Sequence, residues 1–279
     1  MKFSVLVANY NNGKFFRDCY QSILSQSYTD WEVVILDDRS TDNSLQIIRE
    51  LIGEDSRFRI VEHPKNEGVA VIKAKLIELA RGAICGFVDP DDAILPTAIE
   101  NAMADFEKEE KTVLTYSRFM KCDKDLNPLA PSKSARQVVN KDPYFFNCPV
   151  VINHFVCFRR GVYLQTEKIN PALRISEDQD LYLKMYEKGD VKFINDTNYL
   201  YRTHAGGISQ NENKGKSYEY WAKVIWNAMQ RRGLKNIHGQ RIPEKLTGSE
   251  EVFRLIEYQN SFFYRLRRKI SKVFYRLST

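Results

Sequence analysis

The sequence predicts an α/β fold: a single, mostly parallel twisted sheet flanked by helices, with a helical extension at the C-terminal end. Short apolar runs alternate with segments of helical periodicity along the first half, as in a parallel sheet with crossover helices. The runs are continuously apolar, which is typical of strands buried on both faces. Polar and acidic residues follow three of these runs, at the sheet edge where open α/β sheets bind ligands.

The first expected strand, 3–8, is uniformly apolar, and a helix over 14–25 follows because Phe16, Cys19 and Ile23 recur at helical spacing. The next apolar run, 32–36, leads into a turn rich in Ser, Thr, Asp and Asn, the residues that cap helices. The same patterns predict a helix over 44–52, a strand over 58–62, a helix over 69–81 and a strand over 83–88.

The second half has weaker patterns, and residues from about 114 to 141 are polar and interrupted by proline. Short apolar runs and helical periodicity predict strands over 113–119, 150–159, 191–194 and 197–201, and helices over 177–188 and 218–232.

The composition is that of a globular protein able to bury a full core, with 279 residues of which 43% are hydrophobic. No apolar run approaches the ~18 residues of a membrane span, and the N-terminal run is too short for a signal peptide. Five scattered cysteines without CxxC spacing argue against a zinc site and for a reducing cytoplasm. We therefore expect a cytoplasmic protein.

The net charge of +6 belongs largely to one segment, because residues 261–279 carry six basic and no acidic side chains. A general nucleic-acid surface is therefore not indicated. Apolar residues in this segment recur at helical spacing opposite the basic ones, a pattern of helices that lie on anionic membranes. A helix packed on the protein's own core would show the same pattern.

An acidic cluster, Asp89, Asp91 and Asp92, follows the apolar run 83–88. Neighbouring carboxylates repel one another unless a cation or proton neutralises them, and oxygen ligands suit Mg²⁺ or Mn²⁺ held together with substrate phosphates. Neither GxxxxGK[ST] nor GxGxxG is present, so a metal would take the place of a glycine-rich phosphate cradle. The alternative is a solvated Asp/Pro turn that only ends a strand.

Two other strand ends carry similar groups. Tyr10 follows the first strand and could stack on a base, while Asp38 follows the second and could accept a hydrogen bond from a base N–H or a hydroxyl. A half-buried loop aromatic and a turn or helix cap are the alternatives. Because parallel strand ends lie along one edge, the three ends predict one acidic and aromatic cleft.

These motifs, VLVANYNNG, VVILDDRSTDNS, NEG and GFVDPDDAILP, resemble the large inverting glycosyltransferase family of A-type fold, family 2, from Lys2 to about Ser209. The resemblance implies a nucleotide-sugar-binding half over 1–110 and an acceptor and catalytic half over 111–210 of the same domain. Residues 211–279 then form the helical extension.

The resemblance also implies roles. Ala8, Tyr10 and Asp38 fall where the family holds the nucleoside base, and Asp89 and Asp91 form its Asp-X-Asp motif, with Asp91 the direct metal ligand. Asp92 would support the turn or reach the ribose. Lys73 stands where the family often has Arg and would approach the diphosphate, although Ala74 replaces the Asn that often follows. A solvated helix lysine is the alternative.

A second acidic group, Glu177 and Asp178, precedes a helical pattern, where negative charge is also favoured without any function. It resembles the family's Glu-Asp motif, which makes Asp178 the catalytic base that takes the acceptor's proton. Glu177 would orient the loop or contact the acceptor, and Asp180 would be structural. His154 is a candidate for the acceptor pocket.

The element Tyr201-Arg202-Thr203-His204 resembles the family's Tyr-Arg-x-His. It implies that His204 completes the metal shell or contacts the diphosphate, and that Arg202 pairs with phosphate.

The sequence and its resemblance thus predict a metal-dependent inverting glycosyltransferase that uses Mn²⁺ or Mg²⁺. Its donor would be a nucleoside diphosphate sugar, and a UDP-sugar is the favoured one. The acceptor would be a saccharide or lipid-linked saccharide, in surface polysaccharide or glycolipid synthesis at the inner face of the membrane. A non-catalytic sugar-nucleotide-binding or membrane-scaffold protein is the alternative. A sugar-phosphate nucleotidyltransferase would carry a glycine-rich first loop.

Overall fold

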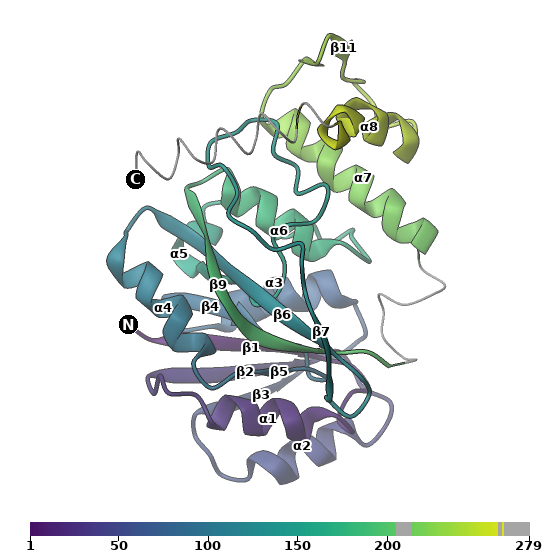
Figure 1. Ribbon diagram of the computed structural model, residues 1–279. Helices are drawn as coiled ribbons and strands as arrows, with labels where there is room; N and C mark the ends of the chain where they lie inside the picture. The colour runs from purple at the N-terminus through teal and green to yellow at the C-terminus, as the bar shows by residue number, and fades with distance from the viewer. Residues whose placement is uncertain (205–213, 262–263, 265–279) are drawn as a thin grey trace.

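The computed structural model describes residues 1–204, 214–261 and 264, and it consists of one nine-stranded sheet with helices on both faces (Figure 1). The predicted α/β class is confirmed. The sheet order is β3-β2-β1-β4-β8-β6-β9-β5, with β7 paired to β6. The first four of these strands are parallel. The sheet becomes mixed beyond β4, where β8 runs antiparallel to both β4 and β6 and β9 runs parallel to β6.

The first half contains β1 Phe3–Asn9, α1 Phe16–Leu24, β2 Trp31–Asp37, α2 Ser44–Ile52, β3 Phe58–Glu62, α3 Val69–Leu79, β4 Ile84–Phe87, β5 Ala93–Ile94 and α4 Ala98–Lys108. The second half contains β6 Thr112–Cys122, β7 Pro128–Pro131, β8 Cys157–Arg159, α5 Arg160–Tyr163, α6 Glu177–Tyr186 and β9 Asp190–Arg202. The extension contains α7 Lys214–Arg231, β10 Asn236–Ile237, β11 Gln240–Arg241, α8 Ser249–Ile256 and the 3-10 turn Glu257–Asn260.

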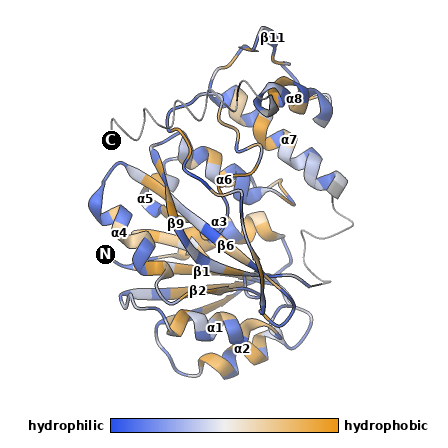
Figure 2. Ribbon diagram, in the orientation of Figure 1, coloured by the Kyte–Doolittle hydropathy of each residue, from blue (hydrophilic) through white to orange (hydrophobic). Residues whose placement is uncertain are grey.

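Alternate residues of β1 enter two separate cores, which explains its unbroken apolar run. Leu6 packs with residues of α3, α6 and α7 on one face of the sheet. Val5 and Val7 pack with residues of α1, α2 and α4 on the other. Both faces of the strand are therefore buried. Figure 2 shows hydrophilic and hydrophobic residues interleaved along the flanking helices, as expected when each helix buries one face.

The segment 150–159 was predicted as one strand, but only its last part, β8, forms a strand. The preceding residues form a buried loop that Asn147 holds, because its side-chain oxygen accepts from the backbone N–H groups of Val151 and Ile152 at 2.8 Å. These bonds replace the ladder that a strand would need. The apolar run in this segment therefore indicated that its residues are buried, and not that they form a strand.

Two further differences between the prediction and the structure concern β9 and α4. The strands predicted over 191–194 and 197–201 are one strand, β9, whose pairing with β6 shifts register between Phe193 and Thr197, so the polar residues between them bulge out. Helix α4 was not predicted, although Ile99, Met103 and Phe106 recur at helical spacing and are buried.

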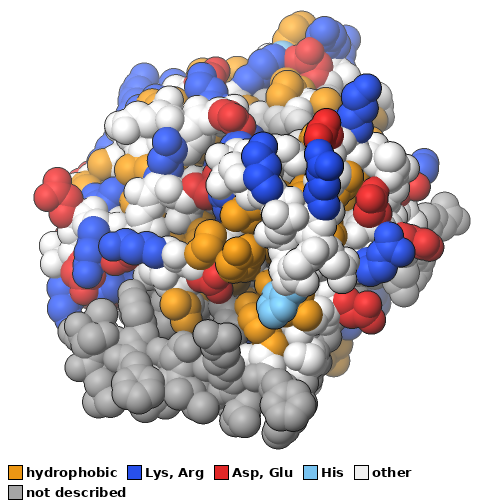
Figure 3. Space-filling view, turned by 90° about the horizontal axis from the view of Figure 1, so that it is seen from above, with side chains coloured by type: hydrophobic (Ala, Val, Ile, Leu, Met, Phe, Trp, Pro, Cys, Tyr) orange, Lys and Arg blue, Asp and Glu red, His pale blue; other side chains and the backbone are white. Residues whose placement is uncertain are grey.

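The extension packs on the sheet domain through α7 and α6 (Figure 1). Viewed from above in Figure 3, basic and acidic side chains are intermixed over this face. Within the described ranges, no helix is long and apolar enough to cross a membrane. The predicted amphipathic segment 261–279 lies outside the described residues except for Ser261 and Tyr264.

Candidate active site

The loop after β1 leaves Tyr10 open to solvent while its neighbours are held. Tyr10 is 44% exposed. Asn9 donates from its side-chain amide to Asp37 at the end of β2, at 2.6 Å. Gly13 packs so closely on α2 that a Cβ there would lie 2.4 Å from the Cα of Ser44. The loop is therefore pinned at both ends, and the Tyr10 ring is available to stack on a planar ligand.

Asp38 is buried and holds the loop that begins α3. One carboxylate oxygen accepts from the backbone N–H of Glu67 and the other from that of Gly68, each at 2.8 Å. Gly68 has a φ of 89°, the region that favours glycine. Each oxygen of Asp38 keeps further acceptor capacity beside Ala8 and Tyr10 of the neighbouring strand end.

Asp91 and His204 meet across 113 residues, as the resemblance implies, with His204 Nε2 2.8 Å from Asp91 Oδ2. Both side chains are largely buried. Burial first, and the charge of Asp89 second, raise the pKa of Asp91 above its ordinary value. The negative charge of this loop is therefore incompletely compensated by protein groups.

Asp92 has a different environment from Asp91. Its carboxylate accepts from the backbone N–H of Arg202 at 2.7 Å, and it is only 2% exposed. Burial, and then the charges of Asp89 and Asp91, raise its pKa well above the ordinary value. Asp92 thus joins the acidic loop to the end of β9, a supporting role.

The guanidinium of Arg202 is buried and donates to three protein acceptors: the carbonyl of Asp91 at 2.5 Å, the carbonyl of Lys124 at 2.6 Å and the carboxylate of Asp18 at 2.6 Å. It also lies over the ring of Phe15. The predicted phosphate contact would require exchange of one of these bonds. The half-exposed Asp18 is the acceptor best placed to be exchanged.

The donor set of Asp89, Asp91 and His204 fits a divalent metal by its chemistry, since carboxylate oxygens and one imidazole suit Mn²⁺ or Mg²⁺. The raised pKa of Asp91 marks a charge that a cation would offset. Among the described residues no group of three or more His, Cys, Asp or Glu is arranged as a ready metal cage. A metal would have to replace the direct contact between Asp91 and His204.

A small cavity is lined by residues from both halves of the chain. It brings Asp89, at the end of β4, together with Asp178 in the first turn of α6, and with Lys73 and His154. The apolar and aromatic part of its lining consists of Phe87, Val156, Ile169, Leu181 and Tyr182. Four predicted site residues from four separate segments therefore share one cavity.

Asp178 accepts a hydrogen bond from the backbone N–H of Gln179 at 2.7 Å. Burial, followed by the neighbouring charge of Glu177, raises the pKa of Asp178 to about 6, while Lys73 acts in the opposite direction. A carboxylate with this pKa is ionised at neutral pH and is a stronger base than an ordinary aspartate.

Lys73 and Glu177 form a buried ion pair beside Asp178, with 2.6 Å between Lys73 Nζ and Glu177 Oε1. Their side chains are 12% and 9% exposed. Burial alone would lower the pKa of Lys73, but the carboxylates of Glu177, Asp89 and Asp178 raise it above its ordinary value. The ammonium is therefore charged and committed to Glu177.

His154 stacks on Tyr199 with ring centroids 4.6 Å apart, and next to Tyr201 at 5.7 Å. Burial lowers the pKa of His154, which favours the neutral imidazole. Sequence reasoning missed Tyr199 and Tyr182 as site residues. Tyr182 stands four residues after Asp178, one helical turn away, and that spacing was the available signal.

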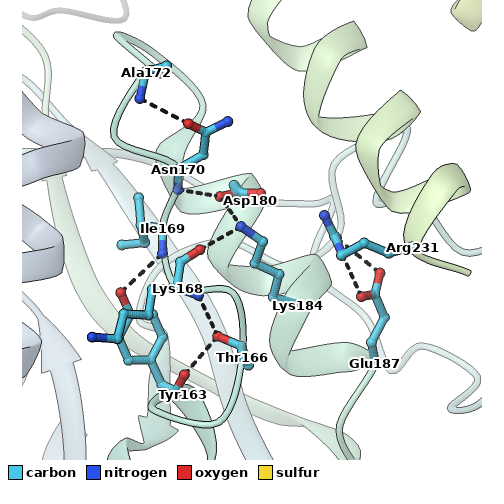
Figure 4. Close-up of polar contacts among 10 residues, drawn as sticks. All are labelled: Tyr163, Thr166, Lys168, Ile169, Asn170, Ala172, Asp180, Lys184, Glu187 and Arg231. Atoms are coloured by element: carbon cyan, nitrogen blue, oxygen red, sulfur yellow. Dashed lines mark hydrogen bonds and ion pairs between the residues drawn. The ribbon is translucent and has the colours of Figure 1, made fainter. Parts of the chain in front are cut away.

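A larger groove of about 850 Å³ lies at the other end of α6, between Lys188, Arg231 and the loop 165–167. None of the predicted site residues lines it. Figure 4 shows its neighbourhood, where Arg231 pairs with Glu187 and Lys184 reaches Asp180. Its size alone does not indicate chemistry, and the small cavity holds the perturbed carboxylate.

Comparison with known proteins adds independent findings. A model of the family described as glycosyl transferase family 2 matches residues 4–165. Chondroitin synthase of Escherichia coli is 28% identical over 237 residues, which are 83% of this chain and 33% of that protein. The chain spans a third or less of the chondroitin and hyaluronan synthases that it matches.

In two other comparisons, the similarity covers more of the matched protein's length. The UDP-Glc:alpha-D-GlcNAc-diphosphoundecaprenol beta-1,3-glucosyltransferase WfaP of Escherichia coli is 29% identical over 212 residues, 76% of this chain and 81% of WfaP. The crystal structure of S. aureus TarS 1–349 in complex with UDP-GlcNAc superposes with a TM-score of 0.67 at 19% identity. This superposition covers 94% of this chain and 73% of the TarS chain. At that identity the TarS match bears on the fold alone.

Proposed function

The chain belongs to glycosyl transferase family 2, and from that premise we propose that it transfers a sugar, with inversion, from a UDP-sugar to a hydroxyl of a saccharide or lipid-linked saccharide. The observation that carries the proposal is Asp178, a carboxylate with a raised pKa that shares a small cavity with Asp89 of the acidic loop. The name of WfaP contains UDP-Glc, which supports a UDP-sugar donor.

The chemistry assigned to this chain is general-base displacement. Asp178 accepts the proton of the acceptor hydroxyl while that oxygen forms a bond to the anomeric carbon. The bond from the anomeric carbon to the diphosphate oxygen breaks in line, and UDP leaves with the electron pair. The raised pKa of Asp178 makes it a better proton acceptor than an ordinary aspartate.

The donor would lie along the ends of β1, β2 and β4. Tyr10 would stack on the base, and Asp38 would accept a base N–H beside the backbone at Ala8. Asp89 would face the ribose and diphosphate, and Arg202 would pair with a phosphate after exchanging Asp18. The roles of Tyr10, Asp38 and Asp89 are supported by their positions at one sheet edge, and that of Arg202 by its contact with the carbonyl of Asp91.

A divalent metal is part of the proposal, held by Asp91 and Asp89 with His204 completing the set. When bound, it would act as a Lewis acid that neutralises the diphosphate. His154 and Glu177, close to Asp178, would face the acceptor. Attachment of 261–279 to an anionic membrane and a cytoplasmic location stay predictions.

The test measures UDP release from a panel of UDP-sugars with Mn²⁺ and oligosaccharide or lipid-linked acceptors. We expect acceptor-dependent release for one donor, and loss of release in Asp178→Asn with UDP binding retained. UDP binding without release from any donor would instead favour the non-catalytic sugar-nucleotide-binding protein. Full activity of Asp178→Asn would remove Asp178 as the base.

A further inference from the structure

We propose that Lys73 is a positioning residue, which holds the start of α6 through its ion pair with Glu177 and thereby orients Asp178. This role takes the place of the diphosphate contact expected from the sequence. The effect on catalysis rests on the proposed function. The ion pair that holds the start of α6, called the brace below, is a property of the fold.

The first support is the geometry of the pair. Lys73 lies in the second turn of α3 and Glu177 is the first residue of α6, 104 residues later, yet their charged atoms are 2.6 Å apart and nearly buried. Lys73 also lies over the ring of Phe87, with its Nζ 5.4 Å from the ring centroid. An ammonium fixed by two neighbours has one defined position, and so does its carboxylate partner.

The second support is that Lys73 pairs with the residue that begins α6, whereas Gln179 and Asp180 of the same turn are held by Asn147 and Asn170. Ser176 precedes the helix with a φ of 67°, and its own side chain makes no capping hydrogen bond. Three acidic residues occupy its first turn. Without a cation beside them, Glu177 and Asp178 would repel one another, and their side chains would have no single preferred arrangement.

The third support is that different parts of the segment 164–176 are held by different parts of the structure. Its middle part is tied to α6 itself, because Asp180 accepts from the N–H of Asn170 at 2.8 Å and Lys184 donates to the carbonyl of Lys168 (Figure 4). Its last part is tied instead to the loop that precedes α3, because Arg174 donates to the carbonyl of Glu67 at 3.0 Å. Lys73 ties Glu177, the first residue of α6, to α3 itself, and Lys168 makes a more exposed pair with Glu78 of the same helix.

A diphosphate role fits this environment less well. Lys73 is the one cation among the described residues that line the small cavity, where it faces Asp89 and Asp178 as well as Glu177. A phosphate that captured the ammonium would leave the carboxylate of Glu177 buried without its partner. Losing one member of a buried pair is strongly unfavourable.

The experiment compares Lys73→Met, Glu177→Gln, the double variant and Lys73→Arg for kcat, donor KM and UDP affinity. Lys168→Met is the matched control, because Lys168 also links the segment to α3, through Glu78, but that pair is about half exposed. We expect each single variant to lower kcat by about tenfold or more with UDP affinity nearly unchanged. The double variant should be no worse than either single one. Lys73→Arg should recover part of kcat, and Lys168→Met should match the wild type.

Weaker UDP binding in Lys73→Met together with normal kcat in Glu177→Gln would overturn the proposal in favour of a diphosphate contact. Additive losses in the double variant would also overturn it. Amide hydrogen exchange over residues 174–180 tests the brace without turnover, with faster exchange expected in Lys73→Met and not in Lys168→Met. Unchanged exchange would refute the brace. A wild-type protein that transfers no sugar would refute the proposed function while leaving the exchange result to decide this one.

Discussion

The acid limb of the pH–rate profile offers the most direct test of Asp178 as the base. The base must be ionised to accept a proton, and burial together with the charge of Glu177 raises the pKa of Asp178 to about 6. The ionised fraction then falls from about nine-tenths at about pH 7 to about one-tenth at about pH 5. We expect kcat to fall about tenfold over this interval, and activity to be lost on the acid side because the raised pKa is that of a base.

A single substitution moves this limb in a defined direction. Glu177→Gln removes the like charge beside Asp178 and frees Lys73 to pair with it, and both changes lower the pKa of Asp178. The limb should therefore shift to lower pH, whatever the change in maximal rate. The assay is kcat at saturating donor, acceptor and Mn²⁺, measured from about pH 4.5 to about pH 8.

The reasoning fails if the wild-type limb lies near 3.8, the ordinary aspartate value, because burial would then not affect the base. It also fails if Glu177→Gln leaves the limb in place. Asp178→Asn is the matched control, since it keeps the shape of the side chain and should remove the limb together with the activity.

Three further outcomes are expected. Asp91→Asn should lower Mn²⁺-dependent transfer by well over about tenfold and weaken Mn²⁺ binding in a calorimetric titration, and an unchanged metal response would contradict the metal assignment. Tyr10→Ala should weaken UDP binding by about 1–3 kcal/mol, the usual value of stacking on a base, with no loss of melting temperature because the ring is 44% exposed; equal UDP affinity would show that the ring does not stack. Asp92→Ala should reduce the free energy of unfolding by about 1–3 kcal/mol, because the buried N–H of Arg202 loses its acceptor, and urea unfolding with an unshifted midpoint would contradict that role.

The fold could be predicted closely where each strand is buried on both faces. Helix α2 and strand β3 have the predicted bounds, and the other elements up to β4 differ by a few residues at their ends. Prediction was weaker where side chains replace the backbone ladder, as Asn147 does before β8. Periodicity reports burial and repeat, and it does not report which group satisfies a backbone N–H.

The assignment of the site residues stays a prediction, and the structure adds the partners of these residues. The resemblance implied that His204 completes the metal shell of Asp91 or contacts the diphosphate, and the structure places the two side chains 2.8 Å apart. The sequence did not indicate that Arg202 would be occupied by Asp18 and two carbonyls, or that Lys73 would be paired with Glu177. Those partners come from segments 78 to 184 residues away in the sequence, and no local pattern encodes them.

The sequence by itself determined the chemistry available to this protein: carboxylates at two parallel strand ends, an aromatic after the first strand, and a second acidic group at a helix start. Motif order and apolar periodicity suffice for this because both are local properties of the chain. Only the tertiary structure decided how the environments of similar acids differ, with Asp92 buried under the N–H of Arg202 and Asp178 buried beside Glu177 with a pKa of about 6. The physical reason is that the pKa of a carboxyl and its free lone pairs depend on burial and on charges brought together by folding.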